Sequence, residues 1–150
     1  MAFLRFERDF KNVILVEQPN GDFGMTMMRQ FLFDAFRQPF YEALQKSTDL
    51  QLSAIAEKSL KETKYHLKHS SEWVIRLGDG TEESHNRIQE SLDLLWRYAN
   101  ELFYMDDVDQ QMIEKGIGVD LNAIKLSWDA TVNAVFEEAT LTIPANNWKF

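Results

Sequence analysis

One segment decides the fold, residues 50–77, which read LQLSAIAEKSLKETKYHLKHSSEWVIRL. Small, apolar and a few polar residues recur in it at alternating intervals of four and three, the spacing that places side chains on one face of an α-helix. The positions of this seven-residue repeat are Leu52, Ala56, Ser59, Thr63, His66, Ser70, Trp73 and Leu77, with Leu60, Leu67 and Val74 beside them. The segment therefore predicts one long amphipathic helix.

The middle of this repeat is small or polar, whereas both of its ends are apolar. Thr63, His66 and Ser70 occupy the middle positions. Buried polar side chains are almost always hydrogen-bonded, so we expect a layer of hydrogen bonds halfway along a helix bundle.

The flanking sequence predicts further helices and few turns. Asp49 offers an N-cap before the segment, and Gly78-Asp79-Gly80 ends it. Only three prolines and six glycines interrupt the chain, fewer than a sheet protein of this length would use. The apolar periodicity indicates four more helices, over residues 23–46, with Pro39 inside, 82–103, 107–115 and 121–139, the last capped by Asp120. The chain is predicted to be all-α, one antiparallel helix bundle over residues 1–150.

Composition excludes several classes of function. Twenty-four acidic and 16 basic residues give a formal charge of −8, which argues against binding to a nucleic acid backbone. There is no cysteine, so disulfides, thiolate metal ligands and thiol catalysis are excluded. No apolar run is long enough to span a membrane, and charges interrupt the first residues where a signal peptide would be apolar. We expect a cytoplasmic protein whose partners are neither nucleic acid nor membrane.

Polar residues on apolar stripes are the candidate functional groups. Asp34 interrupts the stripe of the helix over residues 23–46, and a buried carboxylate needs a partner, for which His66 and Lys61 are the candidates. In the alternative, this helix is rotated so that Asp34 faces solvent. Glu62 and His66 lie four residues apart, on one helix face, where they can share a proton or an ion. An internal ion pair or hydrogen bond with Asp34 is favoured over a metal site.

Carboxylate-bridged di-iron bundles need a different pattern. They use Glu-x-x-His on two helices and one glutamate on each of two others. The residue three positions after Glu62 is Tyr65, and the formal match Glu82 to His85 falls at a helix start, where acidic residues commonly interact with the helix dipole. The sequence therefore predicts no metal site in this chain.

A basic cluster lines one side of the helix over residues 50–77. It comprises Lys58, Lys61, Lys64 and Lys68. Such a cluster is usually a solvated face, and the alternatives are contact with an acidic partner or with a phosphate of coenzyme A.

Several segments together resemble a known family. They are residues 15–23 (LVEQPNGDF), 61–70 (KETKYHLKHS), Trp73 with 76–81 (RLGDGT), Leu95-Trp96 with 101–103 (ELF), and 138–141 (EATL). In this order, over nearly the whole chain, they resemble the PaaA/PaaC family of ring 1,2-phenylacetyl-CoA epoxidase subunits, and in particular its structural PaaC type.

The resemblance implies a ferritin-like fold and a place in a multicomponent monooxygenase. It implies a PaaA-like catalytic partner that holds the di-iron centre and binds phenylacetyl-CoA, with electrons supplied from NADPH by a separate reductase. No cofactor is then expected in this chain, and Asp34, Glu62 and His66 are interpreted as the vestigial polar layer of a metal site. Compared with the family, the chain is expected to lack the first two helices and the C-terminal segment.

Two other functions stay open on the sequence alone. One is a ferritin-like metal-binding oxidoreductase whose remaining ligands come from missing helices or a second copy. The other is a helical interaction module of an unrelated complex. The broad aromatic surface of the first helix, with Phe31, Phe33, Phe36 and Phe40, also predicts association with a partner chain or a homo-oligomer.

Overall fold

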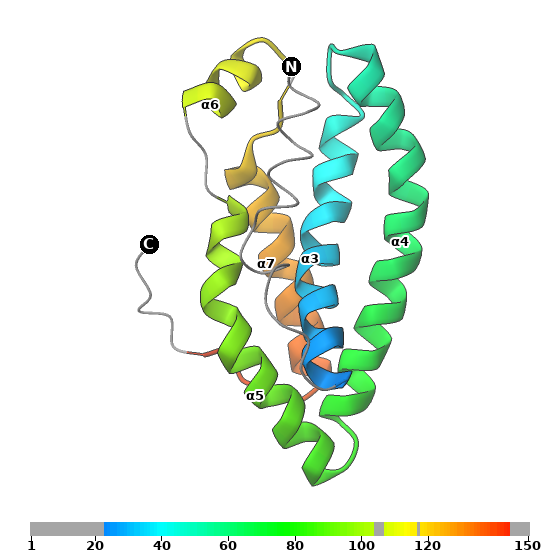
Figure 1. The fold of residues 1–150 in the computed structure, drawn as a ribbon, viewed down its shortest axis with the longest axis vertical. Coiled ribbons are helices and arrows are strands. Elements are labelled where there is room, and N and C mark those ends of the chain that lie inside the picture. The colour runs from blue at the N-terminus through cyan, green and yellow to red at the C-terminus, as the bar shows by residue number, and fades with distance from the viewer. Residues whose placement is uncertain (1–22, 104–106, 117, 145–150) are drawn as a thin grey trace.

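The computed structural model describes residues 23–103, 107–116 and 118–144, and over these residues the chain is an all-α, ferritin-like antiparallel bundle (Figure 1). Its helices are α3 (Phe23–Leu44), α4 (Leu50–Gly78), α5 (Glu82–Ala99), α6 (Asp107–Glu114) and α7 (Leu121–Glu138). A short 3₁₀ helix, η1 (Asn100–Phe103), follows α5. Each helix predicted from the sequence is confirmed to within a few residues at its ends. Residues 15–22, which carry part of the family resemblance, lie outside the described residues.

The helix α3 is the centre of the bundle. It packs against α4, α5 and α7, whereas α4 lies at one edge and α6 sits across one end (Figure 1). Pro39 lies inside α3, as predicted, and the helix continues beyond it to Leu44. None of the helices in the described ranges is long and apolar enough to cross a membrane.

Caps and one glycine explain where the long helices begin and end. The side chain of Asp49 accepts hydrogen bonds from the backbone N–H groups of Gln51 and Leu52, at 3.0 and 3.2 Å, and so starts α4. Asp120 starts α7 in the same way. At the end of α4, a side chain at Gly78 would collide with the backbone carbonyl of Ala139. The ends of α4 and α7 can approach each other this closely only because residue 78 is glycine.

Aromatic rings fill the core between α3, α5 and α7. Trp96 stacks on Trp128 with ring centroids 5.3 Å apart, and Phe31 contacts Phe136 at 5.6 Å. The indole N–H of Trp128 donates a hydrogen bond to the backbone carbonyl of Leu32, at 3.0 Å. The indole N–H of Trp128 is thus satisfied by the backbone of the central helix, and aliphatic side chains such as Leu32, Leu92 and Val132 pack in the same core as the rings.

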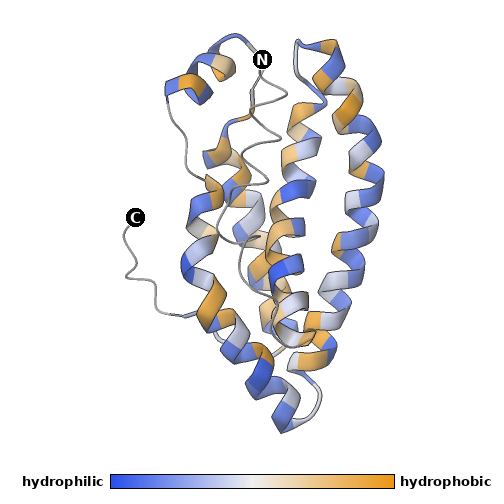
Figure 2. Cartoon of the chain, viewed as in Figure 1, coloured by the Kyte–Doolittle hydropathy of each residue, from blue (hydrophilic) through white to orange (hydrophobic). Residues whose placement is uncertain are grey.

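The buried face of α4 matches the predicted repeat in part, since Leu52, Ala56, Thr63 and Ser70 are buried as predicted. Leu60 and Val74 are buried, whereas the repeat had placed Ser59 and Trp73 there, and these are only half-buried. The buried face therefore lies between the predicted repeat and the apolar positions beside it, because an amphipathic helix turns its apolar stripe towards the core. Figure 2 shows the result, with hydrophilic residues predominating on the outside of α4.

Candidate functional site

A buried carboxylate lies at the contact between α3 and α4. The side chain of Asp34 is fully buried in the middle of α3. The hydroxyl of Ser70, on α4, donates to its Oδ2 at 3.1 Å, and the amide of Gln30 donates to its Oδ1 at 2.9 Å. A guanidinium nitrogen of Arg37 lies 3.6 Å from Oδ1. We call Asp34 and Ser70 the polar seam, because their hydrogen bond joins the two helices.

Burial raises the pKa of Asp34 above the ordinary value of an aspartate. The hydrogen bonds from Ser70 and Gln30 oppose this rise, and so do the electrostatic interactions with Arg37 and His66. The carboxylate is thus desolvated, and both of its oxygens are already occupied by protein donors. It can join two helices, but it has little capacity left to bind a further group.

The structure does not bring the three predicted site residues together. Asp34 is buried, which excludes the alternative in which it faces solvent. Glu62 and His66 have exposed side chains, because the buried face of α4 extends from Thr63 and Ser70 towards Leu60 and Val74, away from His66. No hydrogen bond joins His66 or Lys61 to Asp34 among the described residues; the partner on α4 is Ser70, one turn beyond His66. A vestigial role for the three residues stays a prediction.

A buried polar layer nevertheless exists where the sequence predicted one. Besides Asp34 and Ser70 it contains Thr63, whose hydroxyl donates to the carbonyl of Ser59 at 2.9 Å. Thr63 therefore satisfies itself within α4, and Ser70 is the member of the layer that reaches across to α3. The layer contributes one bond between these two helices.

The formal Glu82 to His85 match lies at a helix start, as expected. Glu82 is exposed in the first turn of α5. His85 contacts the carbonyl oxygen of Gly78 through Nδ1 at 2.8 Å, which links the start of α5 to the end of α4. In the part of the chain that the structure describes, no three His, Asp or Glu side chains are grouped so that they could hold a metal ion.

Sequence reasoning missed two sets of polar contacts. Gln30 and Arg37 stand four residues before and three residues after Asp34, so helical spacing could have identified them as its neighbours. Gln89 could not have been found. Its side-chain amide donates to the backbone carbonyl of Thr142 at 2.8 Å and accepts from the N–H of the same residue at 2.9 Å, across 53 positions of sequence.

Comparison with known proteins gives a family and a curated relative. The profile of a family described as "Phenylacetic acid catabolic protein" matches residues 1–149. The relative is the 1,2-phenylacetyl-CoA epoxidase subunit designated C of Escherichia coli (strain K12), which is 44% identical over 144 residues. These residues are 96% of this chain but 58% of the relative, so the chain spans less than two thirds of that protein's length.

Proposed function

Because this chain belongs to the phenylacetic acid catabolic protein family, we propose that it is a non-catalytic structural subunit of a multicomponent phenylacetyl-CoA epoxidase. In this proposal it assembles in the cytoplasm with a PaaA-like catalytic subunit that holds a di-iron centre and oxidises phenylacetyl-CoA. The observation that carries the proposal is the 44% identity to a protein named as a subunit of such an enzyme.

The placement of the polar side chains supports a structural role. A di-iron bundle directs carboxylates and imidazoles from four helices towards its centre. Here Glu62, His66 and His69 are exposed on α4, and the buried face of α5 consists of Ile88, Ser91, Leu92, Leu95, Trp96 and Ala99. Asp34, the carboxylate that is fully buried among the described residues, is held by protein donors. The described residues do not fit a di-iron centre, and we assign no step of the oxygen chemistry to them.

The experiment measures metal and assembly together. The chain is expressed alone and with the catalytic subunit of a phenylacetyl-CoA epoxidase, and iron is quantified after size-exclusion chromatography. We expect the two chains to elute as one complex, and we expect the iron content to follow the catalytic subunit. The variants Glu62→Ala and His66→Ala should leave the iron of the complex unchanged.

Two results would contradict the proposal. Near-stoichiometric iron in the chain expressed alone, lost in Glu62→Ala, would make it a metal-binding oxidoreductase in its own right. Failure to elute with the catalytic subunit would remove its place in the epoxidase.

A further inference from the structure

A short segment after α7 lies outside the helices and is held against α5. We call residues 140–144 the strap; in Figure 1 it runs from the lower end of α7 past α5. Its Thr142 N–H donates to Oε1 of Gln89 at 2.9 Å, and the carbonyl of Thr142 accepts from Nε2 of the same side chain at 2.8 Å. Leu141 is buried, whereas Thr142 and Ile143 are exposed. One glutamine and one buried side chain therefore hold much of the strap.

The amide of Gln89 is oriented for this contact by a second residue of α5. Nε2 has two N–H groups, and the second donation goes to Oδ1 of Asp93, one turn further along the helix, at 3.0 Å. A carboxylate only accepts hydrogen bonds, so Asp93 keeps the nitrogen end of the amide on its own side and the oxygen end towards the N–H of Thr142. Asp93 is thus a positioning residue, and the amide is preset to pair with a main-chain N–H and C=O.

The start of the strap has a strained backbone. Thr140 has a φ of +61°, a conformation that is unfavourable for a β-branched residue. The N–H of Leu141 donates to the carbonyl of Phe136 at 2.9 Å, a helix ending in which the residue at position 140 is usually glycine. The Thr140 hydroxyl donates to the carbonyl of Gly78 at 3.3 Å, and Nδ1 of His85 donates to the same oxygen at 2.8 Å. These bonds hold a residue whose backbone favours another conformation.

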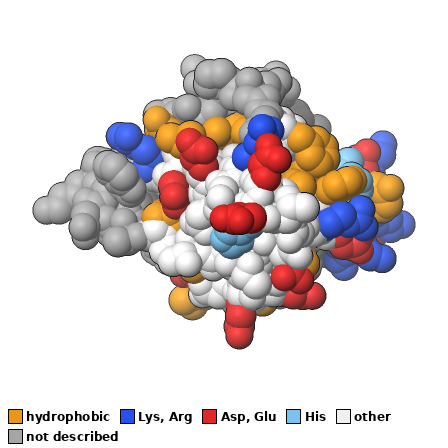
Figure 3. Space-filling model, turned by 90° about the horizontal axis from the view of Figure 1, so that it is seen from below, with side chains coloured by type: hydrophobic (Ala, Val, Ile, Leu, Met, Phe, Trp, Pro, Cys, Tyr) orange, Lys and Arg blue, Asp and Glu red, His pale blue; other side chains and the backbone are white. Residues whose placement is uncertain are grey.

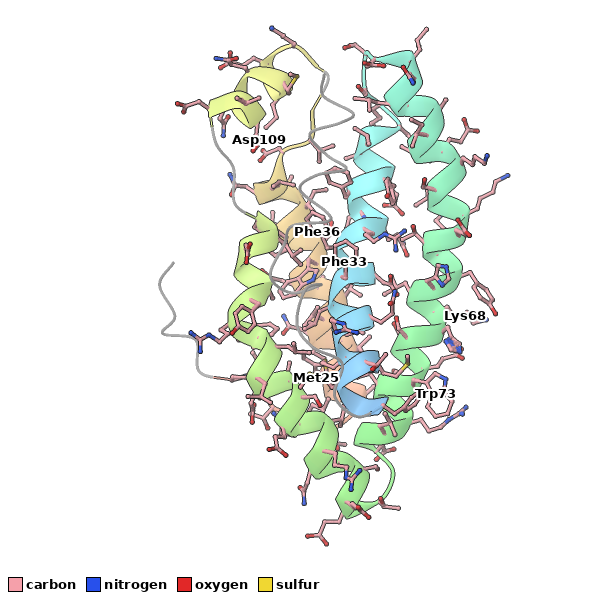
Figure 4. All side chains as sticks on the ribbon, in the orientation of Figure 1. Met25, Phe33, Phe36, Lys68, Trp73 and Asp109 are labelled. Atoms are coloured by element: carbon pink, nitrogen blue, oxygen red, sulfur yellow. The ribbon has the colours of Figure 1, made fainter. Side chains whose placement is uncertain are left out.

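The packing that holds the helices together lies elsewhere. Phe36 stacks on Phe40 with centroids 5.5 Å apart and meets Phe103 at 5.6 Å. Figure 4 shows Phe36 higher in the bundle than the end where α4 and α7 finish and α5 begins. Seen from that end, acidic side chains stand on a largely uncharged surface (Figure 3). The strap, TLTIP, contains no charged residue, so no side-chain ion pair adds to its attachment.

We propose that the strap is a conformational device that opens from α5 as a unit while the helices stay folded. Gln89 and the burial of Leu141 favour the closed state. Thr140 favours the open state, because release lets its φ return to the negative values that threonine prefers. Segments with few buried side chains open at a lower free energy than the core. Opening exposes the seat of Leu141 beside the oriented amide of Gln89, so the strap controls access to this part of α5.

The test follows native-state hydrogen exchange by NMR on the full chain. The reporter is the amide of Leu141, because no substitution below removes its acceptor on α7, and the amide of Val132 in the middle of α7 reports on opening of the bundle. Gln89→Leu removes both bonds to the strap. Gln38→Leu is the matched control, because the amide of Gln38 donates to Glu42 in the same four-residue spacing on α3, at 3.3 Å. Circular dichroism verifies that each variant is folded.

We expect the Leu141 amide to exchange at least about a hundredfold faster than that of Val132 in the unmodified chain. Gln89→Leu should raise the Leu141 rate by about tenfold, because two hydrogen bonds to the strap are lost, and should leave the Val132 rate within about twofold. Gln38→Leu should change neither rate. Equal rates at Leu141 and Val132 in the unmodified chain would overturn the inference. So would a Leu141 rate that Gln89→Leu leaves unchanged, or that Gln38→Leu raises equally.

Two substitutions of Thr140 test the strain separately. Thr140→Val and Thr140→Gly both remove the hydroxyl, but only glycine adopts a positive φ at little cost. The Leu141 amide should therefore exchange about tenfold more slowly in Thr140→Gly than in Thr140→Val. Equal rates, or faster exchange in Thr140→Gly, would mean that the backbone of Thr140 does not favour opening, and would overturn the device as proposed.

Discussion

The central helix α3 is buried on two sides by two different kinds of contact. Towards α5 and α7 it presents rings, and the aromatic core there includes Trp96, Trp128 and Phe136. Towards α4 it presents Asp34, which accepts a hydrogen bond from Ser70, and α4 also adds Leu52, Ala56 and Val74 to the apolar core. The first region gains free energy from the apolar area it removes from water, whereas the second must offset the desolvation of a carboxylate.

This contrast separates stability from specificity. Apolar packing tolerates exchanges of similar volume, because many arrangements of rings fill the same space. The hydrogen bond of the polar seam forms only when Ser70 faces Asp34, so it favours one rotation of α4 over its neighbours. We therefore expect the aromatic core to carry more of the free energy of unfolding, and the polar seam to define how α4 sits on α3.

The largest effect is expected in the aromatic core. Trp128→Ala removes a fully buried ring and its hydrogen bond to Leu32, and should lower the free energy of unfolding by about 3–5 kcal/mol in urea denaturation. Leu126→Ala on the same helix is the control, because Leu126 is 74% exposed, and it should cost less than about 0.5 kcal/mol. Equal losses in the two variants would show that this core is not the main source of stability.

A smaller loss is expected at the polar seam. Asp34→Ala leaves the buried hydroxyl of Ser70 without its partner on α3, and should cost about 1–3 kcal/mol at neutral pH. Ser70 retains a weaker bond to the carbonyl of Leu67, at 3.3 Å, which limits the loss. A cost above that of Trp128→Ala would reverse the comparison of the two regions.

The bond between the helices is isolated by a double-mutant cycle. The variants Asp34→Ala and Ser70→Ala, alone and combined, should show a coupling of about 1 kcal/mol, because each removes the same hydrogen bond. Ser91→Ala is the matched control, since the hydroxyl of Ser91 donates to the backbone carbonyl of Arg87 within α5, and its effect should add to that of Asp34→Ala. If the free-energy losses of Asp34→Ala and Ser70→Ala simply add, as those of Asp34→Ala and Ser91→Ala are expected to, the hydrogen bond of the polar seam contributes no specific stability.

The smallest expected effect is a change in pH dependence. Burial raises the pKa of Asp34, so the carboxyl group of Asp34 binds a proton more tightly in the folded chain than in the unfolded chain. The stability that this contributes is fully present below the ordinary aspartate pKa of about 3.9, and is lost as pH rises through the higher folded value. We therefore expect the free energy of unfolding of Asp34→Asn to exceed that of the unmodified chain by a growing amount as pH rises from about 4 to about 7, measured by urea denaturation.

Ser91→Ala, which changes no titratable group, is the reference for this titration. Its profile should run parallel to that of the unmodified chain. If the difference in free energy of unfolding between Asp34→Asn and the unmodified chain became smaller as pH rises, it would contradict the raised pKa of Asp34.

Much of the fold could be predicted because its signals are local. Asp49 and Asp120 cap the helices that they precede, and the glycines at 78 and 80 end α4. Each of these helix start and stop signals depends on a few neighbouring residues, which can be read from the sequence. The all-α architecture followed from the same signals, and the family from segments spread over nearly the whole chain.

The candidate site was less predictable because it depends on rotation. The predicted repeat and the buried face of α4 share Thr63 and Ser70, but the buried face includes Leu60 in place of Ser59, and His66 is exposed at the opposite margin of the repeat. Burial of Asp34 followed from its place on an apolar stripe, but the identity of its partner required the rotation of α4 to be known. Ser70 lay on the predicted stripe without being recognised as that partner.

The pair of hydrogen bonds between Gln89 and Thr142 has a practical consequence for studying α4. It fastens the backbone at Thr142 to α5, on the opposite edge of the molecule from α4 (Figure 1). A fluorophore or surface linker attached through a cysteine at Ile143, which is 37% exposed, would leave from that edge. The chain could then be immobilised with the lysine-bearing helix directed towards the solution.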